Sequence, residues 1–243
     1  MIIIPAIDIK SGKCVRLKEG KMDQETVFSE HPVDMAGQWF SKGAEILHLV
    51  DLDGAIQGKP VNQKVILEIA SEFKNQVLQV GGGIRNLDSA ALYLDSGISR
   101  IVMGTSAIKE PEILRQISLT YPKRIVLALD VYQGKLKTEG WVEASTTKPL
   151  DLLNSLSDIK ISCIIYTDIS KDGMMSGPNV EATVELARST NIPVIASGGV
   201  SSLDHIRELS RSNVNLEGVI CGRSLYENAF SLEDAIAETQ QKK

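Results

Sequence analysis

Two stretches of the chain share one pattern, and the rest of the sequence is organised around them. Residues 6–13 are Ala6-Ile7-Asp8-Ile9-Lys10-Ser11-Gly12-Lys13, and residues 128–135 are Ala128-Leu129-Asp130-Val131-Tyr132-Gln133-Gly134-Lys135. In each, an apolar run reaches an aspartate, and a turn containing glycine follows. Such a run is typical of a strand buried on both faces of a sheet. Each aspartate is therefore predicted at the end of a buried strand.

Further matches in the same order extend this repeat along the chain. Gly82-Gly83-Ile84 resembles Gly198-Gly199-Val200, Val102-Met103-Gly104 resembles Ile220-Cys221-Gly222, and Asp51 after Leu49-Val50 corresponds to Asp168 after Tyr166-Thr167. The offsets lie between 116 and 122 residues, far longer than the period of a solenoid repeat. We expect two homologous half-barrels, near residues 1–122 and 123–243, within one domain that spans 1–243.

Short apolar runs alternate with amphipathic stretches throughout. The runs predict strands at Ile2–Asp8, Ile46–Asp51, Val77–Gly81, Arg100–Met103, Ile125–Asp130, Cys163–Asp168, Pro193–Ala196 and Gly218–Cys221. Helices are predicted at Val33–Lys42, Gln63–Phe73, Leu87–Ser96, Pro111–Thr120, Leu150–Ser157, Val180–Ser189, Leu203–Ser210 and Leu232–Gln240, with Asn62 and Asn179 as N-caps and Pro111 as a first helical residue. Such alternation gives parallel strands with right-handed crossovers. Since eight units fit 243 residues, the predicted fold class is α/β, a single (β/α)8 TIM barrel.

Composition narrows the classes of partner. The net charge is −5 and the sequence holds no run of Lys or Arg, which argues against nucleic acid. No apolar stretch approaches the ~18 residues of a membrane span, and the N-terminal apolar run ends too early for a signal peptide. Three cysteines without Cys-x-x-Cys spacing and three scattered histidines suggest neither a disulfide framework nor a metal site. We expect a cytoplasmic protein with no membrane partner and no metal.

The strand-end aspartates predict acid–base chemistry. In barrels of this type the active site lies at the carboxyl ends of the strands, so Asp8 and Asp130 should both face it. The repeat places them on opposite sides, which suits a reaction that needs one proton donor and one acceptor. A simpler interpretation is that each carboxylate bonds loop amides, but a symmetric pair favours catalysis.

Glycine clusters that follow four of the strands predict two phosphate sites. Glycine lets backbone N–H groups approach an anion closely, and such barrels commonly hold a phosphate after strands seven and eight. Here a second pair of clusters follows strands three and four, so we expect a bisphosphorylated small-molecule substrate rather than glycines that only permit tight turns. The candidate residues are Gly82, Gly83, Arg85, Gly104, Thr105, Gly198, Gly199, Gly222 and Arg223.

Other candidates carry less weight. His48 lies inside a predicted strand and faces either the site or the core, and Asp51 lies three residues later on the opposite pleat face. Trp141 either stacks on a heterocycle when its loop closes or anchors that loop. Thr167 and the loop residues Asp172 and Gly173 flank the end of another strand. The loops 12–23, 134–141 and 172–178 are candidate lids.

At these residues the chain resembles a known family over essentially its whole length. The stretches that carry the resemblance are Ile4-Pro5-Ala6-Ile7-Asp8, Cys14-Val15-Arg16-Leu17, Leu47-His48-Leu49-Val50-Asp51-Leu52-Asp53-Gly54-Ala55, Gly81-Gly82-Gly83-Ile84-Arg85, Leu127-Ala128-Leu129-Asp130, Thr167-Asp168-Ile169 with Lys171-Asp172-Gly173, and Ala196-Ser197-Gly198-Gly199-Val200. The family is that of the histidine-biosynthesis isomerases, the phosphoribosylformimino-5-aminoimidazole carboxamide ribotide isomerases. The match is much more specific than a lone glycine motif.

The resemblance implies a reaction and roles for the residues. The reaction is an Amadori rearrangement of an aminoaldose to an aminoketose, on a substrate with a phosphate at each end and without cofactor or metal. Asp8 would be the general base that removes the C2 proton, and Asp130 the general acid that opens the ribose ring. Asp172 matches a family aspartate near the site, so the acid role is either shared with it or belongs to it. Thr167 would orient a catalytic carboxylate.

Three alternatives stay open. The sister cyclase of the same pathway shares the repeat and both aspartates and works with a glutaminase partner, but it usually has Cys where this chain has Ala6. A dual-specificity isomerase would also rearrange phosphoribosylanthranilate. A non-catalytic phosphometabolite-binding barrel would not need the two aspartates. We expect a monomer.

Overall fold

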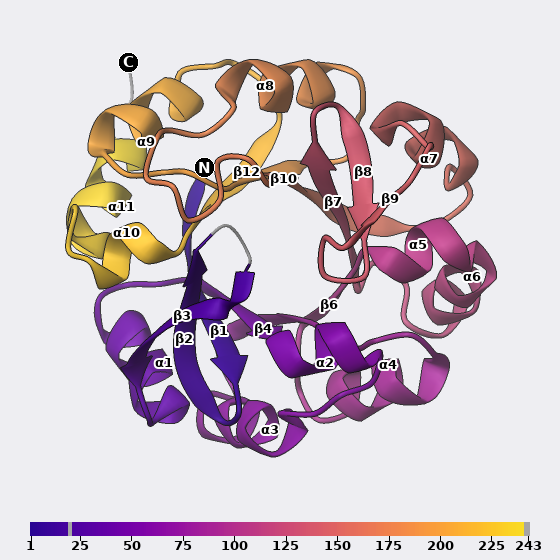
Figure 1. The fold of residues 1–243 in the computed structure, drawn as a ribbon, viewed down its shortest axis with the longest axis horizontal. Coiled ribbons are helices and arrows are strands. Elements are labelled where there is room, and N and C mark those ends of the chain that lie inside the picture. The colour runs from indigo at the N-terminus through magenta and orange to yellow at the C-terminus, as the bar shows by residue number, and fades with distance from the viewer. Residues whose placement is uncertain (19–20, 241–243) are drawn as a thin grey trace.

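Eight strands lie side by side in parallel and close into a ring, shown in Figure 1 along the barrel axis in a computed structural model that describes residues 1–18 and 21–240. In order around the ring they are β1 (Ile2–Lys10), β4 (Ile46–Asp51), β5 (Val77–Gly81), β6 (Arg100–Met103), β7 (Ile125–Tyr132), β10 (Ile161–Asp168), β11 (Val194–Ser197) and β12 (Leu216–Cys221). Pairing of β12 with β1 and of β7 with β10 completes the ring. The predicted TIM barrel is confirmed.

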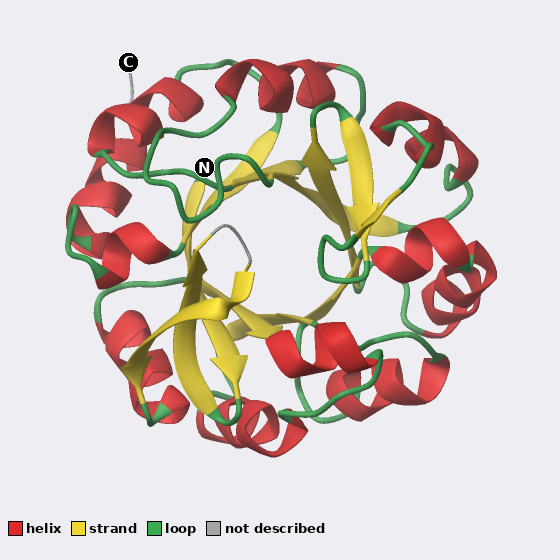
Figure 2. Ribbon diagram, viewed as in Figure 1, coloured by secondary structure: helices red, strands yellow, loops and turns green. Residues whose placement is uncertain are grey.

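Helices surround this ring, as Figure 2 shows. The longer ones are α1 (Pro32–Ser41), α3 (Gln63–Glu72), α4 (Leu87–Leu94), α6 (Pro111–Thr120), α7 (Pro149–Ser155), α8 (Val180–Arg188), α9 (Leu203–Ser210) and α11 (Leu232–Gln240), and each matches a predicted helix within a few residues. Three short helices were not predicted: α2 (Leu52–Gln57), α5 (Thr105–Lys109) and α10 (Arg223–Tyr226). Among the described helices, none is long and apolar enough to cross a membrane.

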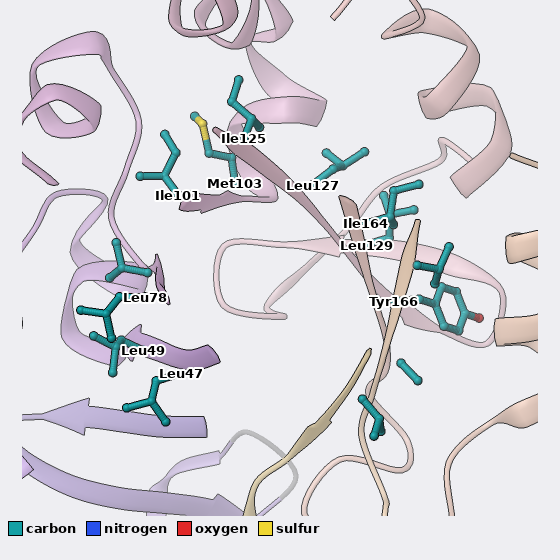
Figure 3. Packing of buried hydrophobic residues seen from close by; sticks show 14 of the residues in the cluster. Leu47, Leu49, Leu78, Ile101, Met103, Ile125, Leu127, Leu129, Ile164 and Tyr166 are labelled. Carbon is teal, nitrogen blue, oxygen red and sulfur yellow. The ribbon is translucent and has the colours of Figure 1, made fainter. Parts of the chain in front are cut away.

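Alternate residues of the strands build two separate apolar layers. The outer layer packs between ring and helices, and Figure 3 labels ten of its members, among them Leu47 and Leu49. The inner layer fills the ring itself and includes Ile4, Ala6 and Ile165. Because successive side chains of a strand point to opposite faces, residues two apart share a layer. Side chains further along the inner rows, towards the carboxyl ends of the strands, therefore face the mouth of the barrel.

Two antiparallel extensions stand beside that mouth. The first is β2 (Lys13–Lys18), which pairs with β1 and with β3 (Lys21–Ser29), and the second is β8 (Lys135–Thr138), which pairs with β7 and with β9 (Glu143–Ala144). Both were predicted only as loops and candidate lids, and residues 19–20 of the first lie outside the described part of the chain. The extensions carry side chains from outside the ring onto its mouth.

All three residues predicted to start helices occupy such positions in the structure. Pro111 is the first residue of α6, and the Asn179 side chain accepts a hydrogen bond from the Ala182 N–H at the start of α8, so both predictions are confirmed. Asn62 occupies the N-cap position of α3 as predicted, but its side chain makes no capping hydrogen bond there. The Asn62 amide instead donates to Asp51 and Asp53 and accepts from the Gly12 N–H. The side chain of this N-cap residue therefore joins the neighbouring loops instead of bonding to the first turn of α3.

Candidate active site

A cavity of about 510 Å³ occupies the mouth of the barrel. It brings together almost all residues predicted for the site. Those that line it are Asp8, His48, Gly82, Gly83, Arg85, Gly104, Thr105, Asp130, Trp141, Thr167, Asp172, Gly173, Gly198, Gly199, Gly222 and Arg223. Asp51 does not line it.

Asp8 faces this cavity from near the carboxyl end of β1, which runs two residues further than predicted because β2 pairs with it, and forms an ion pair with Arg16. The Arg16 Nη1 lies 2.8 Å from the Asp8 Oδ2, and the two side chains are 8% and 17% exposed. Burial raises the pKa of the Asp8 carboxyl, and the neighbouring guanidinium opposes part of that shift. A positive charge at this distance favours the carboxylate form, which is the form that accepts a proton.

Arg16 is the main residue that the sequence analysis did not assign. It lies on β2, is 7% exposed, donates to the carbonyl oxygen of Ala6, and stacks with its guanidinium carbon 4.7 Å from the centre of the Tyr226 ring. The Tyr226 hydroxyl donates to the same carbonyl over 3.1 Å. The signal in the sequence was a lone arginine within the apolar stretch Cys14-Val15-Arg16-Leu17. Only the antiparallel pairing of β2 with β1, which sets Val15 beside Asp8, brings it to the cavity.

Asp130 faces the cavity from β7 and has different neighbours. The strand register sets Thr167 of β10 beside it. Burial raises the pKa of the Asp130 carboxyl, and hydrogen bonding from the side chains of Trp141 and Thr167 opposes the shift. Trp141 holds a left-handed backbone with φ of 74°, which is rare for a bulky residue. Asp8 and Asp130 thus share a position in the fold but differ in the groups around them.

Asp172 is a third carboxyl at the mouth. It lies in the loop between β10 and α8 and also lines the cavity. Burial raises its pKa to about 6, the negative charges of Asp8 and Asp130 add to the shift, and Arg16 opposes it. A carboxyl of this kind holds a proton readily near neutral pH, so it competes with Asp130 for the role of acid.

The glycines of the pairs Gly82–Gly83 and Gly198–Gly199 sit in turns that leave no room for a side chain. Gly82 has φ of +104°, and a Cβ there would lie 2.1 Å from the Asp51 carbonyl oxygen. In the other half, Gly198 has φ of +92°, and its Cβ would lie 2.9 Å from the Asp168 carbonyl oxygen. Close packing of loops therefore requires both glycines. Their N–H groups remain candidates for phosphate binding.

The polar side chains near these turns have partners from neighbouring loops. Arg85 Nη1 lies 3.5 Å from the Glu139 Oε1, and the Thr105 hydroxyl accepts a bond of 2.9 Å from the Glu139 N–H. On the other side, Arg223 pairs with Glu227 and reaches the Gly173 carbonyl oxygen at 3.5 Å. Both arginines therefore line the cavity, and the contact that each makes with a neighbouring loop is long, 3.5 Å in both cases.

Asp51, which the sequence analysis named as a possible site residue, lies outside the cavity lining and holds loops together instead. Its side chain is fully buried and accepts bonds of 2.7–2.8 Å from the N–H groups of Gly54, Val61 and Asn62 and from the Asn62 amide. In the second half, the Asp168 carboxylate accepts a bond of 2.7 Å from the Asn179 amide. The aspartates at the ends of β4 and β10 thus fix the loops that follow them.

His48 faces the cavity from β4, which decides between its two predicted environments. Its Nδ1 lies 3.1 Å from the Gln79 Nε2. Burial lowers the pKa of the imidazole to about 3, and the charges of Arg16 and Arg100 add to this. His48 is therefore neutral across the working range of an enzyme.

The described residues contain no cluster of three His, Cys, Asp or Glu side chains that would hold a metal ion. Cys14, Cys163 and Cys221 are buried and free. The carboxyl groups of Asp8, Asp130 and Asp172, which line the cavity, support proton transfer to and from a bound molecule.

Comparison with known proteins places the chain in a family. A family model described as "Histidine biosynthesis protein" matches residues 2–231. A protein of Hahella chejuensis is 49% identical over 236 residues, covering 97% of both chains, and one of Halorhodospira halophila is 46% identical over 241 residues, covering 99% of this chain and 98% of its own. A protein of Thioalkalivibrio sulfidiphilus is 48% identical over 236 residues, covering 97% and 98%.

All three relatives carry the same name, 1-(5-phosphoribosyl)-5-((5-phosphoribosylamino)methylideneamino) imidazole-4-carboxamide isomerase. The likeness spans both strand-end aspartates, both glycine pairs and Arg16, which all lie within the matched residues. The chain therefore belongs to the histidine biosynthesis protein family, as an isomerase of that family.

Proposed function

We propose that this isomerase performs an Amadori rearrangement of the substrate in its relatives' name, turning an aminoaldose into an aminoketose. The observation that carries the proposal is the pair Asp8 and Asp130, which line one cavity at equivalent strand ends but have different neighbours. Arg16 supplies a full positive charge beside Asp8, whereas the partners of Asp130 are neutral donors. One carboxyl is thus disposed to accept a proton and the other to give one.

The reaction then follows from these two roles. Asp130 donates its proton to the ring oxygen of the ribose, and the ring opens to a Schiff base. Asp8 removes the proton from C2, and the Schiff base becomes an enolamine. Tautomerisation of the enolamine gives the aminoketose. Arg16 favours the ionised form of Asp8 in the second step, since a nearby positive charge opposes the rise of the carboxyl pKa that burial causes.

The acid role has two candidates. Asp172 shares the cavity, and burial together with the charges of Asp8 and Asp130 raises its pKa to about 6. We assign the acid to Asp130, because the register sets Thr167 beside it as an orienting donor. Substitution of each carboxyl separates the two assignments.

The two glycine turns are proposed to bind the two phosphates of the substrate. The relatives' name contains two phosphoribosyl groups, and Gly82–Gly83 and Gly198–Gly199 belong to opposite halves of the chain. Arg85 and Arg223 would each exchange a weak contact for a phosphate oxygen, which forms a stronger charge-assisted bond.

We further propose that the chain acts as a monomer in the cytoplasm. One chain supplies both carboxyl groups and both glycine turns to the cavity. The three cysteines are buried and unpaired, as suits a reducing compartment. Sedimentation of the purified protein, with and without substrate, tests the monomer directly.

The decisive experiment is turnover of the formimino aminoaldose by the purified protein, with ammonia and without metal. We expect Asp8→Asn and Asp130→Asn each to lower kcat by about 100-fold or more with little change in KM, as removal of a general base or acid does. Asp88→Asn, an exposed aspartate of α4, is the matched control. A large loss in Asp172→Asn with a small loss in Asp130→Asn would move the acid role to Asp172.

Other outcomes point to the alternatives. Cyclisation of the aminoketose with ammonia, without action on the aminoaldose, would identify the sister cyclase chemistry. Turnover of phosphoribosylanthranilate as well would identify a dual-specificity isomerase. Binding without either reaction would leave a phosphometabolite-binding barrel and refute the proposed reaction.

A further inference from the structure

A row of polar side chains crosses the interior of the barrel next to the cavity. His48, Gln79 and Arg100 lie at neighbouring register positions of β4, β5 and β6. The His48 Nδ1 is 3.1 Å from the Gln79 Nε2, and Arg100 Nη2 donates to the Gln79 Oε1 over 2.9 Å. His48 lines the cavity, whereas Gln79 is fully buried and lies outside its lining. The proposed reaction assigns no role to this row.

The far end of the row is held by groups from other strands of the ring. Arg100 Nη1 donates to the Glu217 Oε1 of β12 over 2.6 Å and lies 3.5 Å from the Cys163 Sγ of β10. The Arg100 and Glu217 side chains are 13% and 21% exposed. A buried charge pair is expensive to rearrange, because loss of either partner leaves an uncompensated charge. The guanidinium is therefore a rigid donor to Gln79.

The donor and acceptor chemistry of the row fixes the position of one proton. A guanidinium has only donors, so it must face the carbonyl oxygen of Gln79. The amide nitrogen of Gln79 then faces His48, and an amide nitrogen only donates. The His48 Nδ1 must accept that bond. In a neutral imidazole the proton then resides on Nε2, the other ring nitrogen.

We propose that Gln79 and Arg100 are positioning residues that hold His48 as the neutral Nε2–H tautomer, so that its ring donates a hydrogen bond to an acceptor atom of the bound substrate. The substrate contact rests on the proposed function, whereas the tautomer is a property of the free protein. Burial and two nearby arginines keep the ring neutral by lowering its pKa to about 3, so acidification does not supply the second proton. The orientation of the Gln79 side-chain amide thus determines which ring nitrogen of His48 carries the proton.

The tautomer is measured by nitrogen NMR of the free protein labelled with ¹⁵N-histidine. The sequence has only three histidines, so His48→Gln identifies the signal of His48 by its loss. We expect a pyridine-like shift at Nδ1 and a pyrrole-like shift at Nε2. Gln79→Glu replaces the donor by a carboxylate that only accepts, and it should move the proton to Nδ1. A pyrrole-like Nδ1 in the unaltered protein would overturn the inference.

Kinetics test whether the row acts through His48. Loss of one neutral hydrogen bond to the substrate should lower kcat/KM by about tenfold in Gln79→Glu. In a His48→Gln background the side-chain amide supplies its own donor, so the same substitution should change kcat/KM by less than about twofold. Gln76→Glu, an exposed glutamine just before β5, is the charge-matched control.

Two results would refute the positioning role. One is an equal loss from Gln79→Glu in both backgrounds, which indicates a general structural effect. The other is unaltered kcat/KM despite a shifted tautomer. If Gln79→Glu does not fold, Gln79→Met removes both bonds with similar volume and should give a mixture of His48 tautomers. Absence of isomerase activity in every protein would count against the proposed function, and the NMR result would still decide the tautomer.

Discussion

The ion pair between Arg16 and Asp8 allows the sharpest test of the proposed site. The charged atoms are 2.8 Å apart and the side chains are 8% and 17% exposed. At an effective dielectric constant of about 20, two unit charges at that separation attract by roughly 6 kcal/mol. Water in the open cavity screens part of this attraction. About 1.4 kcal/mol changes a protonation equilibrium tenfold, so even a quarter of this attraction shifts the protonation equilibrium of Asp8 by about tenfold.

We therefore expect Arg16→Met to raise the pKa of Asp8 and to leave much of the carboxyl protonated at neutral pH. A base must be ionised, so kcat at pH 7 should fall by about tenfold or more and should partly recover as the pH rises. Arg16→Lys keeps the positive charge, so it should shift the acidic limb of the plot of kcat against pH less than Arg16→Met does. Plots of kcat against pH for the three proteins measure the effect, with Arg115→Met, which breaks a pair on the surface, as control.

A different result would refute this reasoning. If Arg16→Met lowers kcat by the same factor at every pH, Arg16 does not act on the charge of Asp8. Its stacking on Tyr226 and its bond to the Ala6 carbonyl would then account for the loss.

Three further predictions concern stability, each measured by urea unfolding. Gly82→Ala should lower the free energy of unfolding by several kcal/mol, because its Cβ would lie 2.1 Å from a backbone oxygen. Gly97→Ala, at a glycine with φ of +101° and open space around it, should lower it by only about 1 kcal/mol. Similar losses in the two variants would contradict the packing argument. Asn62→Ala should lower the free energy of unfolding by about 2 kcal/mol, because it removes the side-chain amide that donates to the buried Asp51 and to Asp53, and a loss below about 0.5 kcal/mol would contradict that. The folded-state pKa of Asp172, about 6 against an ordinary 3.8, destabilises the fold as the pH rises through that window. Asp172→Asn should therefore stabilise the protein at pH 8 by up to about 3 kcal/mol, with no gain below about pH 4, and a gain independent of pH would exclude this cause.

The barrel could be predicted because its strands are buried on both faces. Such strands appear in the sequence as short apolar runs, and all eight predicted runs are strands of the ring. The extensions β2–β3 and β8–β9 could not be predicted in the same way. Residues 14–17 of β2 are all buried and include Arg16, and β3 exposes Val27, so these two strands show no regular alternation of apolar and polar residues. Arg16 was missed for that reason, since its approach to Asp8 depends on the path of β2.

The alternation of side chains along a strand would have shown that His48 and Asp51 cannot both belong to the site. His48 and Asp51 are three apart on β4, so only one of them can face the cavity. His48 does, and Asp51 points outward to the loops. The contact of the Asn62 side chain with the Gly12 N–H joins residues 50 positions apart along the chain, and no local signal reveals such a contact.

The unlike surroundings of the two strand-end aspartates have a consequence for how a ligand lies in the mouth. A cavity with true twofold symmetry would accept a molecule with a phosphate at each end in two opposed directions, and only one of them would present the reacting sugar to the correct carboxyl. Arg16 with Tyr226 on one side and Trp141 on the other give the cavity unlike surroundings, which under the proposed function would make the two directions unequal in energy. Under the proposed function, the two halves of the ring would offer similar binding positions, and Arg16 and Trp141, carried by the two antiparallel extensions, would select one orientation of the substrate.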